Sequence, residues 1–156
     1  MTRTTERGSV SIEVAVLAPA FIALMVLAGV VGRSAVAAEA IDAAAHDAAR
    51  AASISRESGA ARREALEAAQ NQLDWRGLAC TNDLAPVFSG SVVGETDTSF
   101  DNAFKSKVGE DATVTVEITC LVSFRDITLD ILPGMPSERQ ISAKFTSPLD
   151  RYRGRQ

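Results

Sequence analysis

The stretch that decides the fold is Arg7-Gly-Ser-Val-Ser-Ile-Glu13, followed by Val-Ala-Val-Leu-Ala-Pro-Ala-Phe-Ile-Ala-Leu-Met-Val-Leu-Ala-Gly-Val-Val-Gly-Arg33. The run from Val14 to Gly32 is 19 residues long and carries no charge. As an α-helix it measures about 28 Å at 1.5 Å per residue, close to the hydrocarbon thickness of a bilayer. A soluble core helix seldom needs so long a stretch that is apolar on every side. The sequence therefore predicts a membrane-spanning helix.

The charges that flank this span predict its orientation. Arg3, Arg7 and the amino terminus precede it, with Glu6 and Glu13 against them, and the positive-inside rule counts Lys and Arg. Arg33 follows the span, but a long domain comes after it, and long domains are translocated largely regardless of charge. We expect a single-pass protein with a cytoplasmic amino terminus and an extracytoplasmic carboxy-terminal domain.

The leader before the span has a Gly at position 8 and a carboxylate five residues later, at Glu13. This spacing resembles the class III leader of type IV pilin-like proteins, in which a prepilin peptidase cuts after a Gly on the cytoplasmic side. The wider run is Arg-Gly-Ser-x-x-x-Glu before a span that contains Pro19 and ends Gly32-Arg33. It resembles the TadE-like pseudopilins of tight-adherence (Flp-type) pilus systems, over about a sixth of the chain.

The resemblance implies cleavage between Gly8 and Ser9, with Ser9 as the new amino terminus. A Gly at the cut site also lets the backbone approach a protease closely. A carboxylate at the membrane edge is costly to bury and seeks a partner. The resemblance implies that Glu13 pairs with the new terminal ammonium group of an adjacent subunit and so guides subunit assembly. The plainer interpretation is that Glu13 is solvated at the headgroup boundary.

Three residues of the span are candidates for helix packing. Pro19 removes a backbone donor and loosens the helix, which neighbouring helices in a bundle can compensate. Ala28 and Gly32 form a small-xxx-small pair that allows close helix contact. An ordinary kink at Pro19 and a chance pairing of small residues remain the alternative interpretations.

The function that the resemblance implies is that of a minor pilin or pseudopilin, which takes part in the assembly or initiation of a tight-adherence, type IV-like pilus. The implied partners are the prepilin peptidase, other pilin-like subunits, the inner-membrane assembly platform and membrane lipid. The implied location is the bacterial cell membrane or a surface pilus.

Two other interpretations stay open. Ala35-Val36-Ala37 fits the small-x-small rule of signal peptidase, and cleavage there would release an exported soluble binding domain that begins at Ala38. Against this, the apolar segment exceeds the usual length of about 7–15 residues, and Glu13 directly precedes it. The other interpretation is a membrane-tethered extracytoplasmic protein unrelated to pili, with an uncleaved helix.

The chain from residue 33 to residue 73 is rich in Ala, Glu, Gln, Arg and Leu, which favour helix. A seam of mostly small residues recurs at three- and four-residue steps, and charged side chains with His46 follow another face. The seam consists of Ala37, Ile41, Ala44, Ala48 and Ala52. A break is expected at Ser55–Gly59, so we expect two helices that form an extended stalk.

After Trp75 the pattern changes to alternation, which is typical of strands. Residues 112–124 place one apolar set on a single face: Val114, Val116, Ile118, Cys120, Val122 and Phe124. Ile127, Leu129 and Ile131 alternate before a Pro133-Gly134 turn, and Ile141, Ala143 and Phe145 predict a last strand. We expect a small antiparallel sheet packed on the second helical segment, and a long loop over residues 89–111.

Cys80 and Cys120 are the only cysteines. An oxidising compartment outside the membrane favours a disulfide between them, and two free buried thiols are the alternative. Such a bond would add about 4 kcal/mol by the chain-entropy argument, which matters for a domain of about 80 residues. Two cysteines so far apart with one distant His46 are not a recognised metal-ligand set.

Nothing in the sequence points to catalysis, a cofactor or nucleic acid. His46 is the sole histidine and is expected on a solvated face, while Asp126 and Asp130 are expected as exposed strand residues. The net charge is −4, and the basic tail of Arg151, Arg153 and Arg155 is short, which disfavours nucleic-acid binding. We therefore expect a protein that is not an enzyme and that has no metal or cofactor.

The sequence predicts an α+β fold in which a long transmembrane and stalk helix precedes a small antiparallel sheet domain. The expected divisions are a leader at residues 1–8, a transmembrane helix at 9–33, Ala-rich stalk helices at 34–73 and a small extracytoplasmic β-rich domain at 74–156.

Overall fold

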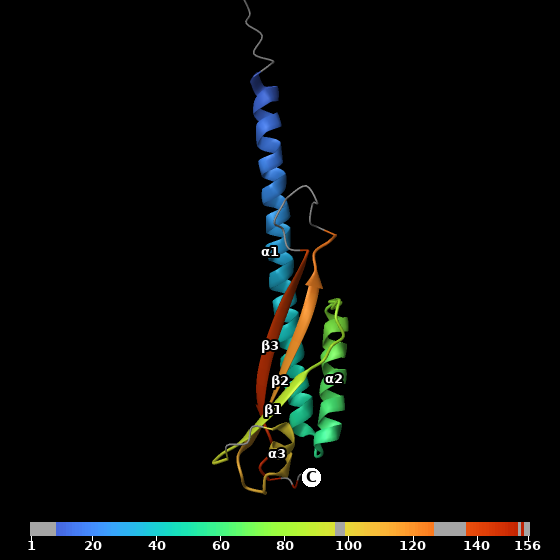
Figure 1. Cartoon of the computed structure of the whole chain (residues 1–156), viewed down its shortest axis with the longest axis vertical. Coiled ribbons are helices and arrows are strands. Elements are labelled where there is room, and N and C mark those ends of the chain that lie inside the picture. The colour runs from blue at the N-terminus through green and yellow to red at the C-terminus, as the bar shows by residue number, and fades with distance from the viewer. Residues whose placement is uncertain (1–8, 96–98, 127–136, 153, 155–156) are drawn as a thin grey trace, which may run out of the picture.

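The computed structural model describes residues 9–95, 99–126, 137–152 and 154, with side chains from Glu13 onward. Its elements in chain order are α1 (Ser9–Ile54), α2 (Ser58–Trp75), β1 (Val87–Val92), α3 (Phe100–Lys105), β2 (Ala112–Ser123) and β3 (Glu138–Pro148). Figure 1 shows the first half of α1 projecting alone from a domain built by its second half and the other elements. The predicted α+β class, a long apolar helix followed by a small antiparallel sheet, is confirmed.

The second half of α1 and the whole of α2 form an antiparallel helical pair (Figure 1). The helices break after Ile54, and α2 begins at Ser58, as the Ser- and Gly-bearing segment predicts. We expected α2 to prolong the stalk, but it folds back along α1. The reason lies in its buried residues, Ala61, Ala65, Ala69 and Leu73, which recur every four positions and form one narrow apolar stripe.

Small side chains form most of the helical core. All five residues of the predicted seam in α1 are buried, and Ala40, Ala45 and Ala49 are buried as well. The buried surface is wider than a single seam because α1 packs against α2 and also against β2 and β3. Alanine contributes little buried area, but it allows the helices and the sheet to approach α1 closely.

The sheet has three antiparallel strands in the order β1-β2-β3, so β2 is central. Alternate residues of β2 are buried from Ala112 to Val122, and Phe124 beyond its end is buried too, which confirms the predicted apolar face. The last predicted strand is also present. Ile141 and Ala143 of β3 lie opposite Cys120 and Ile118 and are partly buried against the core.

The expected packing of the sheet on the second helical segment is wrong. β2 and β3 pack on α1, whereas α2 mainly contacts α1. Ser147 of β3 donates a hydrogen bond to Ser53 of α1 at 3.0 Å, and the ring of Phe145 lies 4.4 Å from that of His46, centroid to centroid. The sheet can lie there because most of the buried side chains of α1 are alanine, which leaves room for it.

The expected long loop over residues 89–111 is also wrong, because β1 and α3 occupy much of it. Gly90 explains why the sequence of this segment looks like a loop although it contains a strand and a helix. A Cβ at this position would lie 2.6 Å from the Cβ of Ala103, so only Gly lets α3 rest on β1. Ser99 caps α3 by accepting a hydrogen bond from the Asn102 backbone N–H, and Phe100 and Phe104 are buried. The predicted strand at 127–131 and the turn at 133–134 lie outside the described residues.

Cys80 and Cys120 form a disulfide, with an S–S distance of 2.04 Å, which is the first of the two predicted alternatives. It joins the segment after α2 to the centre of the sheet. Next to it, the Thr81 N–H donates to the Leu121 carbonyl, and the Leu121 N–H donates to the Asn82 side chain. The disulfide and these bonds attach the end of the helical hairpin to β2.

Candidate functional site

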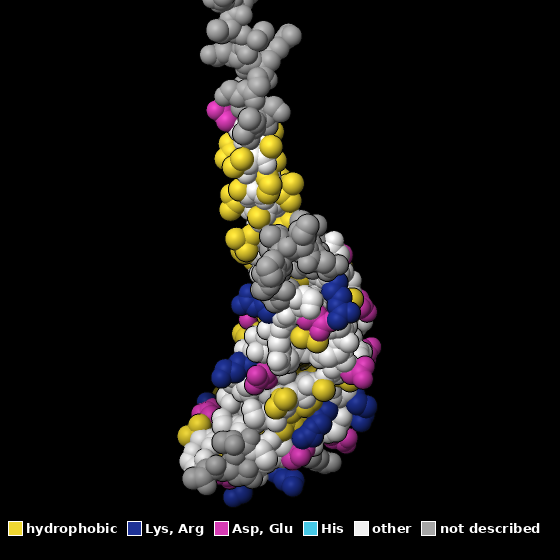
Figure 2. Space-filling view, turned by 45° about the horizontal axis from the view of Figure 1, so that its top comes forward, with side chains coloured by type: hydrophobic (Ala, Val, Ile, Leu, Met, Phe, Trp, Pro, Cys, Tyr) yellow, Lys and Arg dark blue, Asp and Glu magenta, His cyan; other side chains and the backbone are white. Residues whose placement is uncertain are grey.

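The stem, defined here as residues 13–32 of α1, is the candidate functional surface. Its large apolar side chains are exposed on all sides, for example Leu24 at 62% and Met25 at 72%. Figure 2 shows these side chains as a yellow column between the domain and the grey atoms at the amino-terminal end. Within the described part of the chain, nothing buries the most apolar window of this helix.

An uncovered apolar helix of this length needs a nonaqueous environment, because each Å² of exposed apolar surface costs roughly 25 cal/mol in water. Among the described residues, one helix is long and apolar enough to cross a membrane, and the stem is part of it. The stem therefore indicates a single-pass membrane protein. Its backbone is compatible with that environment because helical N–H and C=O groups bond within the segment.

Glu13 lies at the amino-terminal end of the stem and is exposed. Ser9 is the first residue of α1, so Glu13 follows it by about one helical turn. Gly8 lies outside the described residues, and the side chain of Ser9 is not described. The part of the chain that the structure describes forms no ion pair with Glu13, which leaves this carboxylate available to a partner.

The three predicted packing residues lie along the exposed stem. Pro19 is inside α1, which continues through it, and Pro19 has no N–H to donate to the carbonyl of Ala15. Ala28 is exposed, and a Cβ added at Gly29 or Gly32 would meet nothing within 4 Å. The small-residue patch is therefore open, which is the condition for close approach of another helix.

An ion pair anchors the domain at the end of the stem. Arg33, the first residue after the span, donates to Asp126 just beyond β2, with an N···O distance of 2.5 Å. This hydrogen bond, together with one from the backbone N–H of Asp126, lowers the pKa of the Asp126 carboxyl. Asp126 is exposed as expected, although it lies in a turn; Asp130 lies outside the described residues. Sequence reasoning missed this pair because it treated Arg33 only as a topology signal.

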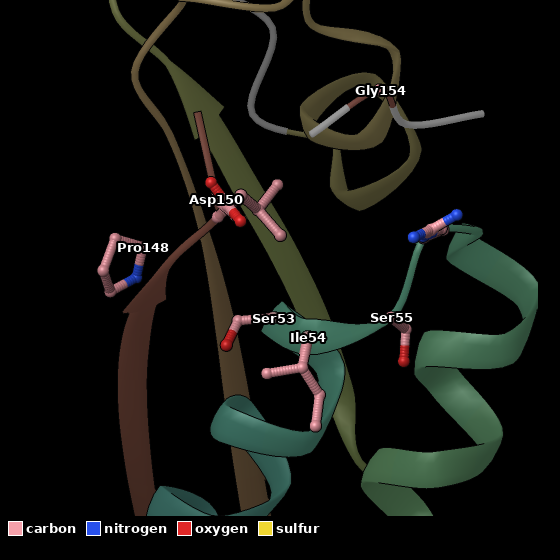
Figure 3. A pocket seen from close by; sticks show the side chains of 8 residues that line it. Ser53, Ile54, Ser55, Pro148, Asp150 and Gly154 are labelled. Carbon is pink, nitrogen blue, oxygen red and sulfur yellow. The ribbon is translucent and has the colours of Figure 1, made fainter. Parts of the chain in front are cut away.

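The opposite end of the domain has a hollow of about 360 Å³. Its lining consists of Ser53, Ile54, Ser55, Arg56, Pro148, Leu149, Asp150 and Gly154. Figure 3 shows Ser53 and Ile54 at the end of α1 on one side of the hollow, with Pro148 at the end of β3 and Asp150 beyond it on the other. The lining contains hydroxyl groups and two charged groups but no histidine or cysteine that would activate a nucleophile.

His46 is partly buried, not simply solvated as expected, because its ring packs on the edge of Phe145. Its Nδ1 lies 3.2 Å from the carboxylate of Asp47. Across residues 9–95, 99–126, 137–152 and 154, no group of three or more His, Cys, Asp or Glu side chains is arranged to hold a metal ion.

Comparison with known proteins finds a family model that is similar to the first part of the chain. Residues 8–50 match the family model of TadE-like protein, a match that begins at Gly8 and ends before α2. The resemblance seen in Gly8, Glu13 and the span is therefore confirmed over these residues. TadE-like proteins are associated with tight-adherence pili and are structural, not catalytic. No curated protein and no solved structure matched the chain.

Proposed function

We propose that this TadE-like chain is a minor pilin or pseudopilin, processed by a prepilin peptidase after Gly8, that takes part in the assembly or initiation of a tight-adherence pilus. The observation that carries the proposal is the uncovered apolar stem, with Glu13 at its amino-terminal end and open small residues at Ala28 and Gly32. A membrane tether needs only the apolar residues. The carboxylate and the small-residue patch add features that suit lateral packing with other stems.

In this proposal, cleavage exposes the amino group of Ser9 one helical turn before Glu13. An amino group and a carboxylate so placed on neighbouring stems can pair in the bilayer, where an unpaired charge is expensive. Such pairing sets the axial register between subunits. The carbonyl of Ala15, which Pro19 leaves without its helical donor, can accept a hydrogen bond from a neighbouring helix. The small residues Ala28 and Gly32 allow the helices to pack closely.

The domain moves with the stem because both share α1. The second half of α1 lies at the centre of the core, between α2 and the sheet. No hinge separates stem from domain within α1, since the helix is continuous from Ser9 to Ile54. We infer that the domain presents a surface to other subunits or to the assembly platform in an orientation set by the stem.

Release by signal peptidase is the weaker candidate. Cleavage after Ala37 would remove a buried residue from the core, since Ala37 is 1% exposed. It would also remove Arg33 and so break the ion pair with Asp126. Retention of the stem keeps both interactions.

Mass spectrometry of the mature chain from its native host tests the proposal. We expect an amino terminus at Ser9, because the peptidase cuts after Gly8. A terminus at Ala38 would indicate a secreted domain, and one at Met1 or Thr2 an uncleaved anchor; either result would overturn the proposal.

Two variants separate processing from assembly. Gly8→Leu should abolish cleavage because a large side chain blocks the close backbone approach, whereas Thr5→Leu, a matched change within the leader, should be cut normally. Glu13→Gln should be cut and inserted like the wild type, but it should no longer copurify with other pilin-like subunits. Normal copurification of Glu13→Gln would rule out the assembly role of this carboxylate.

A further inference from the structure

The end of α2 that faces the stem carries an unusual pair of exposed side chains. Trp75 is the only tryptophan and is 77% exposed, and the guanidinium carbon of Arg76 lies 5.3 Å from the centroid of its ring. Figure 1 shows this end of α2 on the side of the domain from which the stem projects. No carboxylate in the described part of the chain pairs with Arg76.

The position of this pair is set by the way α2 ends. Gly77 adopts a φ of +65°, its N–H donates to the Asp74 carbonyl, and the Leu78 N–H donates to the Leu73 carbonyl. These two bonds are the Schellman arrangement, which needs a residue such as Gly in the left-handed region. Leu78 packs against the core beside buried Leu73. The chain is therefore firmly held on both sides of Arg76.

The height of Arg76 above the span follows from the α1 residues that line the same hollow. Arg76 lines a hollow together with four α1 residues, Arg33, Val36, Ala37 and Ala40. These α1 residues lie one to eight positions beyond Gly32, or about 1.5–12 Å along the helix. The headgroup layer on each side of a bilayer is about 5–8 Å thick. If the stem spans the hydrocarbon, this range covers the headgroup layer and the first few Å beyond it, so Arg76 lies close to the headgroups.

We propose that Trp75 and Arg76 form a contact between the domain and the phospholipid headgroups of the membrane that the stem crosses. Tryptophan is enriched at membrane interfaces because its ring is apolar and its N–H is polar. Among the described residues, the carboxylates of Asp126 and Glu138 pair with Arg33 and Arg125, and no carboxylate pairs with Arg76. The guanidinium of Arg76 is thus available to a lipid phosphate.

This contact gives the domain a second attachment beside the stem. It holds α2 against the bilayer and limits rotation of the domain about the axis of α1. The inference rests on the proposed function only for the membrane-spanning stem; it requires neither cleavage after Gly8 nor a pilus.

Fluorescence of the sole tryptophan tests the contact directly. The full chain is reconstituted in vesicles of phosphatidylethanolamine and phosphatidylglycerol, and stem insertion is checked separately by resistance to alkaline extraction. We expect Trp75 emission to be shielded from iodide and quenched by phospholipids brominated near the headgroup. Iodide-accessible emission without lipid quenching, from a chain that resists extraction, would overturn the contact while leaving the proposed function intact.

A matched pair of variants measures the part played by the charge. A single Arg near an anionic surface changes a binding equilibrium about fivefold, so Arg76→Gln should shift the balance toward iodide-accessible Trp75 by that factor. Arg56→Gln, at the far end of the domain, should leave Trp75 unchanged. Shielding that lacks lipid quenching and weakens as protein is diluted in lipid would identify a contact between protein copies and would overturn the proposal.

Discussion

At the scale of single residues, Gly90 controls how closely α3 lies on the sheet. A side chain there would meet the Cβ of Ala103, the Ser99 carbonyl and the Thr113 carbonyl within 3.2 Å. Two of these three atoms belong to the backbone and cannot move aside cheaply. This position was missed from sequence because a Ser-Gly-Ser run resembles a loop.

Gly90→Ala should lower the free energy of unfolding by about 1–3 kcal/mol, the usual cost of overpacking. Chemical denaturation of the oxidised chain in detergent, followed by Trp75 fluorescence, measures the change. Gly59→Ala is the control, because Gly59 lies in α2 with room for a methyl group and its replacement should stabilise the helix. Equal stability of Gly90→Ala and the wild type would contradict the close contact.

Asp126 gives a pH-dependent prediction. Its pKa is lowered in the folded chain by the hydrogen bond from Arg33 and by its own backbone N–H. The pair therefore contributes fully above the pKa of Asp in the unfolded chain, and the contribution is lost as pH falls through the lower folded pKa. An NMR titration of the carboxyl carbon should show the lowered midpoint.

Arg33→Gln should raise that midpoint toward the ordinary aspartate value, whereas Arg50→Gln, at a distant exposed position of the same helix, should not. A midpoint that does not respond to Arg33→Gln would show that the guanidinium is not the cause.

At the scale of elements, the two halves of α1 differ in the size and the exposure of their apolar side chains. Its first half exposes large apolar side chains, and its second half buries small ones between α2 and the sheet. The large side chains suit lipid or other stems, which adapt their shape. The small ones suit close packing against fixed neighbours.

Ala65→Leu should destabilise the helical pair by about 1–3 kcal/mol, because Ala65 is fully buried in the stripe of α2 that packs into the core. Thermal unfolding by circular dichroism checks this. Ala38→Leu adds the same volume at an exposed position of α1 and should be nearly neutral. Similar losses in both variants would mean that α2 is not closely packed.

The disulfide attaches one element to another and should account for a large share of the stability of the domain. Replacing Cys80 and Cys120 by Ser should cost about 4 kcal/mol, because the bond closes a loop with a sequence separation of 40. Denaturant unfolding of the variant and of the wild type with and without reductant measures the loss. A reductant that leaves the wild type unchanged would contradict the bond.

At the scale of the whole molecule, the chain is a domain built around the end of its own membrane helix. The proposed orientation, with the amino terminus inside the cell, puts the domain outside. Protease added to spheroplasts should then degrade the domain and leave a membrane-bound fragment that contains the stem. A cytoplasmic marker protein should stay intact in the same sample, and a protected domain would reverse the orientation.

Much of the fold could be predicted from sequence because its signals are local. The span depends on an unbroken apolar run, and the Ala seam of α1 and the alternation of β2 depend on periodicity within one element. The seam and the strand were both predicted with the correct face buried. β1 and α3 could not be predicted, because Gly90 and Ala103 make sense only when both are placed together. The packing of the sheet on α1 likewise depends on which helix leaves more room.

For the candidate site the division is similar. Glu13, Pro19 and the small residues of the stem were identified from spacing in one helix, and the family match covers the same segment. The Arg33–Asp126 ion pair was not identified, because its two residues are far apart in the chain. The Trp75–Arg76 pair was not identified either, because its position beside α1 depends on the fold.

By itself, the sequence determined that this protein has a membrane-length apolar helix and, before it, a Gly-to-Glu spacing that resembles a pilin leader, since both are properties of consecutive residues. Only the tertiary structure decided that α2 folds back, that the sheet rests on α1 and that the end of α2 with Trp75 lies on the side of the domain from which the stem projects. The physical reason is that each of these depends on close packing between surfaces, and packing is settled only when all of the surfaces are present.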